Sequence, residues 1–101
     1  MADSNKTAFI TGASSGFGAA IAERLAKRGF HLVLLARRKD RLEQLASALA
    51  VPVHVIGCDV RDEQALRSAV SALPAEFATI DVLVNNAGLA LGLEGAHEAA
   101  W

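Results

Sequence analysis

The chain has 101 residues, enough for one small domain, and 52% of them are hydrophobic against 21% charged, a balance that excludes a disordered segment. The formal net charge of −1 provides no basic surface, so neither nucleic acid nor a membrane is expected as a partner. A single cysteine, Cys58, excludes an internal disulfide and is typical of a reducing, cytoplasmic setting.

The first third of the chain predicts two strands with a helix between them. The apolar run 7–11 predicts a strand that ends in a glycine-rich turn, and the pattern changes to helical spacing over 15–28. Three apolar residues at helical spacing are expected on the buried face of this helix: Phe17, Ile21 and Leu25. Gly29 lies where a left-handed helix cap is needed. The nearly continuous apolar run 31–36 then predicts a strand buried on both faces.

The rest of the chain repeats this alternation. A second helix is predicted over 38–49 and a third strand over 53–56. Asp62 is expected to N-cap a third helix that ends before Pro74. The inner stripe of that helix is expected to be Leu66, Val70 and Leu73. A fourth strand is predicted over 80–85. The alternation predicts an α/β fold, the N-terminal part of a doubly wound, Rossmann-type parallel sheet with four strands and three helices.

The strongest functional pattern is the turn 11–18, Thr-Gly-Ala-Ser-Ser-Gly-Phe-Gly, between the first strand and the first helix. Gly12 permits a sharp turn, Gly16 lets a dinucleotide approach the backbone, and Gly18 lets the helix pack closely on the strand. The helix N-terminus offers unpaired N–H groups to phosphates, and the two serine hydroxyls either add donors or cap the helix. The residues assigned to dinucleotide binding in this turn are Gly12, Ser14, Ser15, Gly16, Phe17 and Gly18.

Other interpretations of this turn remain. A glycine-rich turn that binds no ligand has the same local sequence. A methyltransferase also places a nucleotide at such a turn, usually with a different glycine spacing. A phosphate-binding loop of the Walker type is excluded, because no Gly-Lys-Ser/Thr follows. The strand–turn–helix context favours a dinucleotide.

Two motifs together resemble the short-chain dehydrogenase/reductase family: Thr-Gly-x-x-x-Gly-x-Gly in the turn, and Asn-Asn-Ala-Gly at 85–88. Over residues 73–77 and 80–92 the chain is more similar still to the NADP-dependent 3-hydroxy acid (serine 3-) dehydrogenases of that family. The resemblance implies a homo-oligomeric enzyme that moves a hydride between nicotinamide and a small-molecule carbonyl or alcohol substrate, with 3-hydroxy acids as one class.

The end of the second predicted strand favours NADP over NAD. In NAD-binding folds an acidic residue at this place accepts hydrogen bonds from the adenosine ribose. Counting along the strand, the place falls at Ala36, and Arg37 and Arg38 follow at once. A guanidinium binds a 2′-phosphate through charge-assisted hydrogen bonds. The alternative is that both arginines are solvated charges at a helix start, where positive charge is mildly unfavourable.

The family resemblance implies further contacts with the cofactor. Asp59 is expected to face the adenine amino group and Val60 to pack beside the ring, although Asp59 also suits a loop or capping role. The residues expected to line the cofactor's ribose through their backbone, and to tie the central strands together, are Asn86, Ala87 and Gly88. No metal site is expected, because no histidine has a cysteine or histidine neighbour at ligand spacing.

The sequence contains no tyrosine. The resemblance implies that catalysis uses a Tyr-x-x-x-Lys pair and a serine, with the tyrosine exchanging the proton. We therefore expect residues 1–101 to be the dinucleotide-binding portion of a single Rossmann-type domain, truncated at the C-terminus and inactive by itself. The tail also departs from the 3-hydroxy acid dehydrogenases near Gly95. The alternative is a non-catalytic module that binds or senses NADP.

Overall fold

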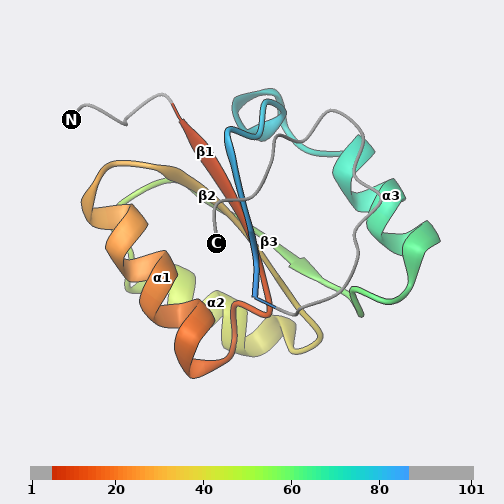
Figure 1. Ribbon diagram of the computed structural model, residues 1–101, viewed down its shortest axis with the longest axis horizontal. Coiled ribbons are helices and arrows are strands. Elements are labelled where there is room, and N and C mark those ends of the chain that lie inside the picture. The colour runs from red at the N-terminus through yellow and green to blue at the C-terminus, as the bar shows by residue number, and fades with distance from the viewer. Residues whose placement is uncertain (1–5, 87–101) are drawn as a thin grey trace.

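The computed structural model describes residues 6–86 (Figure 1). Strands and helices alternate along them, as the sequence predicts. The elements are β1 (Thr7–Thr11), α1 (Gly16–Lys27), β2 (His31–Ala36), α2 (Lys39–Ser47), β3 (Val53–Gly57), α3 (Glu63–Ser71), the 3-10 helix η1 (Ala75–Phe77) and β4 (Val82–Asn85). None of the helices in this part of the chain is long and apolar enough to cross a membrane.

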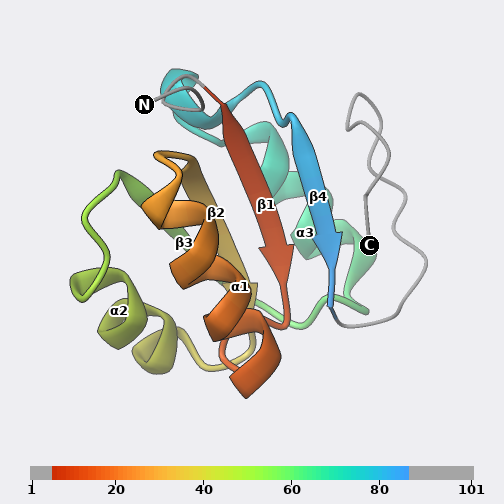
Figure 2. The same ribbon diagram turned by 60° about the vertical axis from the view of Figure 1, so that its left-hand side comes forward.

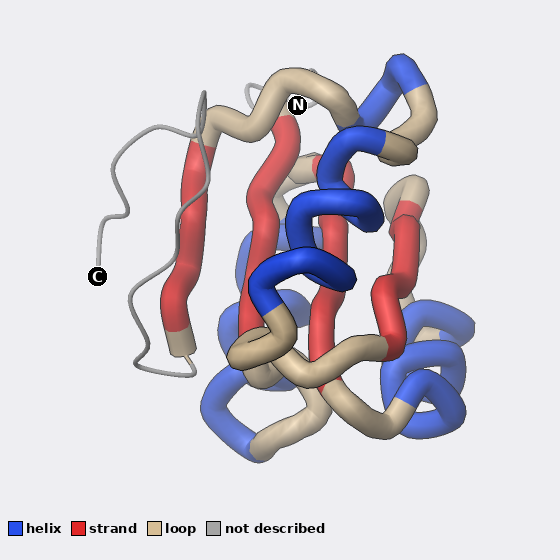
Figure 3. Tube along the Cα trace, turned by 90° about the vertical axis from the view of Figure 1, so that its right-hand side faces the viewer, coloured by secondary structure: helices blue, strands red, loops and turns tan. Residues whose placement is uncertain are grey.

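The four strands form one parallel sheet in the order β3-β2-β1-β4 (Figures 2 and 3). Residues of α1 and α2 pack on one face of the sheet, and residues of α3 and η1 pack on the other. Since parallel neighbours need crossover connections, each helix links one strand to the next across a face. This arrangement confirms the predicted doubly wound, Rossmann-type fold, and β4 forms one edge of the described sheet.

The central strands are buried on both faces, as their continuous apolar runs predict. In β1, Ile10 belongs to the core beneath α1 and α2, whereas its neighbour Phe9 belongs to the core beneath α3. In β2, Leu34 and Leu35 divide in the same way. All four side chains are almost completely removed from solvent. The sheet is therefore a rigid layer whose ends hold the loops in place.

Helix α1 is fixed at both ends by the residues that the sequence suggests. Ser15 is the N-cap, and its hydroxyl accepts a hydrogen bond from the Gly18 N–H. At the other end Gly29 has a φ of 92°, the left-handed conformation expected there. The Gly29 N–H donates to the Ala26 carbonyl and the Phe30 N–H to the Leu25 carbonyl, the two hydrogen bonds of a Schellman cap.

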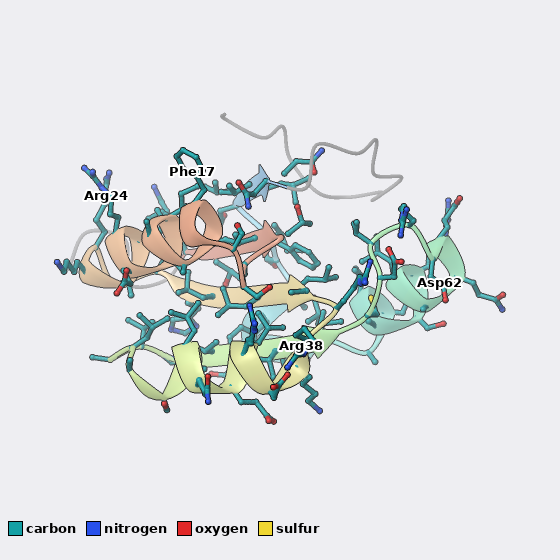
Figure 4. The ribbon with its side chains drawn as sticks, turned by 90° about the horizontal axis from the view of Figure 1, so that it is seen from below. Phe17, Arg24, Arg38 and Asp62 are labelled. Carbon is teal, nitrogen blue, oxygen red and sulfur yellow. The ribbon has the colours of Figure 1, made fainter. Side chains whose placement is uncertain are left out.

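The prediction that Phe17 belongs to the helix core is wrong. Its side chain is 79% exposed and points outward from α1 (Figure 4). The buried stripe of α1 lies one residue further along and consists of small residues: Gly18, Ala22 and Ala26. Because these residues allow the helix to approach the sheet closely, Ile21 and Leu25 flank the contact and are only partly buried.

The later elements agree with the predictions except at their ends. Asp62 N-caps α3 by accepting a hydrogen bond from the Ala65 N–H, as expected. The predicted inner stripe of α3 also packs on the core, with Leu66 buried and Val70 and Leu73 partly buried. Strand β4 begins two residues later than predicted. Before it, the Thr7 N–H donates to the Asp81 side-chain carboxylate, whereas in a strand pair it would donate to a backbone carbonyl. Helix α2 is shorter than the predicted 38–49, and η1 was not predicted.

Candidate functional site

The carboxyl ends of the parallel strands meet at one edge of the sheet, and a cleft of about 290 Å³ opens there. Open α/β sheets bind ligands in this position. The cleft lies between the turn after β1, the start of α2 and the loop after β3. Its lining residues are Gly12, Ser14, Leu35, Ala36, Arg37, Arg38, Cys58, Asp59 and Val60.

Six of these residues were assigned to the cofactor from the sequence: Gly12, Ser14, Arg37, Arg38, Asp59 and Val60. The fold therefore brings together residues from three separate segments of the chain. Leu35, Ala36 and Cys58 were not assigned as contacts. The signal that could have found them is position, because Leu35 and Ala36 end β2 directly before Arg37, and Cys58 follows β3 directly before Asp59.

The turn after β1 depends on glycine at two places, for different reasons. Gly12 has a φ of 63°, which residues with a side chain rarely adopt. At Gly18 an added Cβ would lie 2.3 Å from the Gly12 carbonyl oxygen and 2.7 Å from the Ala13 Cα. The close approach predicted for Gly18 is confirmed, with the turn at the end of β1 as its partner.

The first turn of α1 presents open space and unpartnered donors. A Cβ at Gly16 would meet no atom within 4 Å. Among residues 6–86, the Gly16 and Phe17 N–H groups have no hydrogen-bond partner. The first turn also carries no acidic side chain. A helix N-terminus with free N–H groups attracts anions, so these residues fit a pyrophosphate.

The two serines of the turn have different roles. The Ser15 hydroxyl accepts hydrogen bonds from the Gly18 N–H at 3.2 Å and from the Asn86 amide at 2.9 Å. Its one proton donates to the Gly12 carbonyl oxygen at 2.9 Å. Ser15 therefore has no hydrogen-bonding capacity left and serves as the helix cap. The Ser14 hydroxyl lines the cleft and has no partner among the described residues, so it can donate to a ligand.

Asn86 connects the end of β4 to this turn. Its side-chain amide donates to the Gly12 carbonyl oxygen at 3.0 Å as well as to Ser15. Asn86 was predicted to contact the cofactor through its backbone, and this side-chain role was not predicted. Ala87 and Gly88, which were assigned with it, lie outside the described residues.

The two arginines after β2 are in different electrostatic states. Arg38 forms a bidentate ion pair with Asp40, with nitrogen–oxygen distances of 3.0 and 3.1 Å. The hydrogen bonds from Arg38 hold the pKa of the Asp40 carboxyl below its usual range. Arg37 is exposed and makes no hydrogen bond or ion pair with another of residues 6–86, although its charge acts weakly on Asp59. At the end of β2, where an NAD-binding fold would carry an acid, Ala36 offers the cleft no carboxylate.

Asp59 lines the cleft and also stabilises its own loop. Its carboxylate accepts hydrogen bonds from the Arg61 backbone N–H at 2.9 Å and from the Arg61 guanidinium at 3.1 and 3.3 Å. The Arg61 side chain, then its backbone N–H and more weakly the charge of Arg37, lower the pKa of Asp59. Asp59 is therefore anionic at neutral pH, and its loop role does not remove it from the cleft.

The remaining candidate groups suggest no further chemistry. Burial raises the pKa of the Cys58 thiol, and the nearby charges of Asp62 and Asp59 raise it further, so the thiol is protonated at neutral pH. His31 and His54 both pack against the Phe77 ring. Within residues 6–86 no group of three histidine, cysteine or acidic residues is arranged to hold a metal ion.

The family model for short chain dehydrogenases matches residues 6–100. The chain belongs to the short-chain dehydrogenase family. It is 50% identical over 94 residues to a serine 3-dehydrogenase of Agrobacterium fabrum, covering 93% of this chain and 38% of that protein. It is 53% identical over 91 residues to a sulfoacetaldehyde reductase of Chromohalobacter salexigens, covering 88% and 36%.

A solved structure titled as the closed form of serine dehydrogenase complexed with NADP+ is also similar. It superposes with a TM-score of 0.75 at 36% identity, covering 79% of this chain and 32% of that one. These matches confirm the predicted family and the similarity to serine 3-dehydrogenases. The chain spans little more than a third of the length of the curated relatives it matches.

Proposed function

We propose that this chain is the dinucleotide-binding portion of an NADP-dependent short-chain dehydrogenase/reductase. The observation that carries the proposal is the cleft itself. It lies beside the turn that leads into the free N–H groups of α1. At the end of β2, where an NAD-binding fold would carry an acid, it has Ala36, and Arg37 follows directly. The similar serine dehydrogenase structure complexed with NADP+ supports the same cofactor.

Each part of the cofactor has residues that fit it. The Gly16 and Phe17 N–H groups and the Ser14 hydroxyl would hold the pyrophosphate, where the missing Cβ of Gly16 leaves room. Arg37 would bind the 2′-phosphate, and Val60 and Asp59 would contact the adenine. Asn86 shapes the turn through Gly12 and Ser15, and Ala87 and Gly88 would follow it along the ribose.

When bound, NADPH would supply a hydride to a carbonyl carbon, and NADP+ would accept one from an alcohol carbon. Tyrosine, the proton donor implied by the family resemblance, is absent from the 101 residues. The cleft residues would therefore contribute the orientation of the cofactor and charge, and not the proton transfer. We therefore propose that the 101-residue chain alone gives no turnover and that catalysis belongs to the whole protein. The same proposal includes a small-molecule substrate, with 3-hydroxy acids as one class. It also includes a homo-oligomeric assembly and a cytoplasmic location for the whole protein.

Direct titration with NADPH and with NADH tests the cofactor assignment. We expect NADPH to bind at least about tenfold more tightly, because a charge-assisted contact is worth roughly 1.5–3 kcal/mol. Equal affinities would refute the choice of NADP, and no binding of either cofactor would refute the site. Turnover assays of the whole protein separate an enzyme from the alternative, a non-catalytic module that binds or senses NADP.

A further inference from the structure

Two ion pairs of the same form stand beside the candidate cleft. Asp59 is paired with Arg61 in the loop after β3, and Arg38 is paired with Asp40 at the start of α2. In each pair one partner lines the cleft and the other lies outside its lining. Both pairs are bidentate, with nitrogen–oxygen distances of 3.0 to 3.3 Å.

These pairs determine the net charge that the cleft presents to a ligand. Its charged lining residues are Arg37, Arg38 and Asp59. Asp40 compensates the charge of Arg38, and Arg61 compensates the charge of Asp59. Arg37 therefore remains as the uncompensated charge of the lining. Without Arg61, the Asp59 carboxylate would offset Arg37, whose charge it already feels, and would repel an incoming phosphate.

We propose that Arg61 is a positioning residue that determines cofactor specificity. By holding and neutralising Asp59, it lets the cleft accept the extra phosphate that distinguishes NADP from NAD. The inference rests on the proposed function and extends it to a residue outside the cleft lining. Arg61 acts through Asp59 and needs no contact of its own with the cofactor.

Arg61→Gln removes the charge and keeps much of the side chain. Its guanidinium side chain is 66% exposed, so its loss should leave the fold intact. We expect NADPH affinity to fall about threefold to fivefold at low ionic strength, the scale of an exposed charge interaction, and NADH affinity to change less. Near 1 M salt, where the screening length is about 3 Å, the difference should largely disappear.

Arg67→Gln is the matched control. Arg67 forms an ion pair of similar length with Glu63, and its side chain is 56% exposed, but neither partner lines the cleft. This variant should leave the ratio of NADPH to NADH affinities unchanged. Arg61→Lys keeps the charge and should keep most of the preference. In the double variant Asp59→Asn/Arg61→Gln no carboxylate remains to be neutralised, so the ratio should return to the parental value or exceed it.

The affinity ratio, measured by titration at low and high salt, decides the matter. A ratio that falls in Arg61→Gln, recovers in the double variant and is insensitive to Arg67→Gln supports the inference. An unchanged ratio in Arg61→Gln, an equal fall in Arg67→Gln or no recovery in the double variant overturns it and leaves the proposed function standing. Failure of the parent protein to bind either cofactor overturns both.

Discussion

Gly16→Ala and Gly18→Ala place the same methyl group on the first turn of α1, two residues apart, and the structure predicts different consequences. At Gly16 the new carbon would meet no atom within 4 Å. At Gly18 it would lie 2.3 Å from the Gly12 carbonyl oxygen and 2.7 Å from the Ala13 Cα. Each substitution therefore serves as the control for the other.

The cost at Gly18 follows from which atoms it meets. Both belong to the backbone, so rotation of a side chain cannot relieve the contact. Helix and turn would have to separate by about an ångström, and overpacking of this kind costs about 1–3 kcal/mol. Alanine returns up to about 1 kcal/mol through its higher helix propensity. We expect a net loss of about 1–2 kcal/mol and a Tm lower by roughly 4–15 °C for a domain of this size.

At Gly16 the helix propensity gain is unopposed, so stability should be unchanged or higher by up to about 1 kcal/mol. The methyl group would instead occupy the space beside the free N–H groups, where we place the pyrophosphate. We expect NADPH affinity to fall at least about tenfold, since those charge-assisted contacts are worth roughly 1.5–3 kcal/mol each. Gly16→Val should abolish binding.

Urea unfolding followed by circular dichroism, together with NADPH titration, separates the two effects. A Gly18→Ala variant as stable as the parent would show that helix and turn do not approach as closely as described. A folded Gly16→Ala variant that binds NADPH with parental affinity would show that the pyrophosphate lies elsewhere.

Three further predictions concern the cleft. Arg37→Ala should weaken NADPH binding by about one to two decades, because a charge-assisted contact is worth roughly 1.5–3 kcal/mol, and should leave NADH binding nearly unchanged. Arg24→Ala is the control, because Arg24 lies toward the end of α1 that is away from the glycine-rich turn (Figure 4). Equal weakening of NADPH and NADH binding by Arg37→Ala would show that Arg37 has a structural role. Ser14→Ala should lower NADPH affinity and leave the stability of the fold unchanged. Loss of the Ser15 cap should lower the free energy of unfolding by about 1 kcal/mol, measured by urea unfolding. The reverse result would contradict the division of roles between the two serines. Because its pKa is raised, the Cys58 thiol should react slowly with iodoacetamide at pH 7. Bound NADPH should slow this reaction further, because Cys58 lines the cleft. A reaction rate that NADPH does not change would place the cofactor outside the cleft.

The sequence predicted the strands well because their burial leaves a clear signal. The run 31–36 has the same bounds as β2 in the structure, since a strand covered on both faces must be apolar throughout. The helical spacing of apolar residues gave a wrong prediction in α1, where Phe17 was expected in the core but is exposed. Helical periodicity favours large apolar residues, but the contact with the sheet is made by small ones such as Ala22, which allow the closest packing.

The candidate site was predicted in its residues but not in its pairings. Motif order places Arg37 and Asp59 after adjacent strands, and parallel strands end at a common edge. The ion pairs of Asp59 with Arg61 and of Arg38 with Asp40 join residues two apart, a spacing that does not bring side chains together in a regular helix. Loop conformation makes these contacts, and no periodic pattern in the sequence encodes it.

The turn after β1 shows how shaping and binding are divided among neighbouring groups. The Gly12 carbonyl, the Ser15 hydroxyl and the Asn86 amide bond to one another, so these groups are used in fixing the backbone. The Gly16 and Phe17 N–H groups make no such bond and stay available at the helix N-terminus. Because these hydrogen bonds fix the backbone that carries the donors, binding needs little further ordering. Removal of a shaping group should therefore lower stability and affinity together.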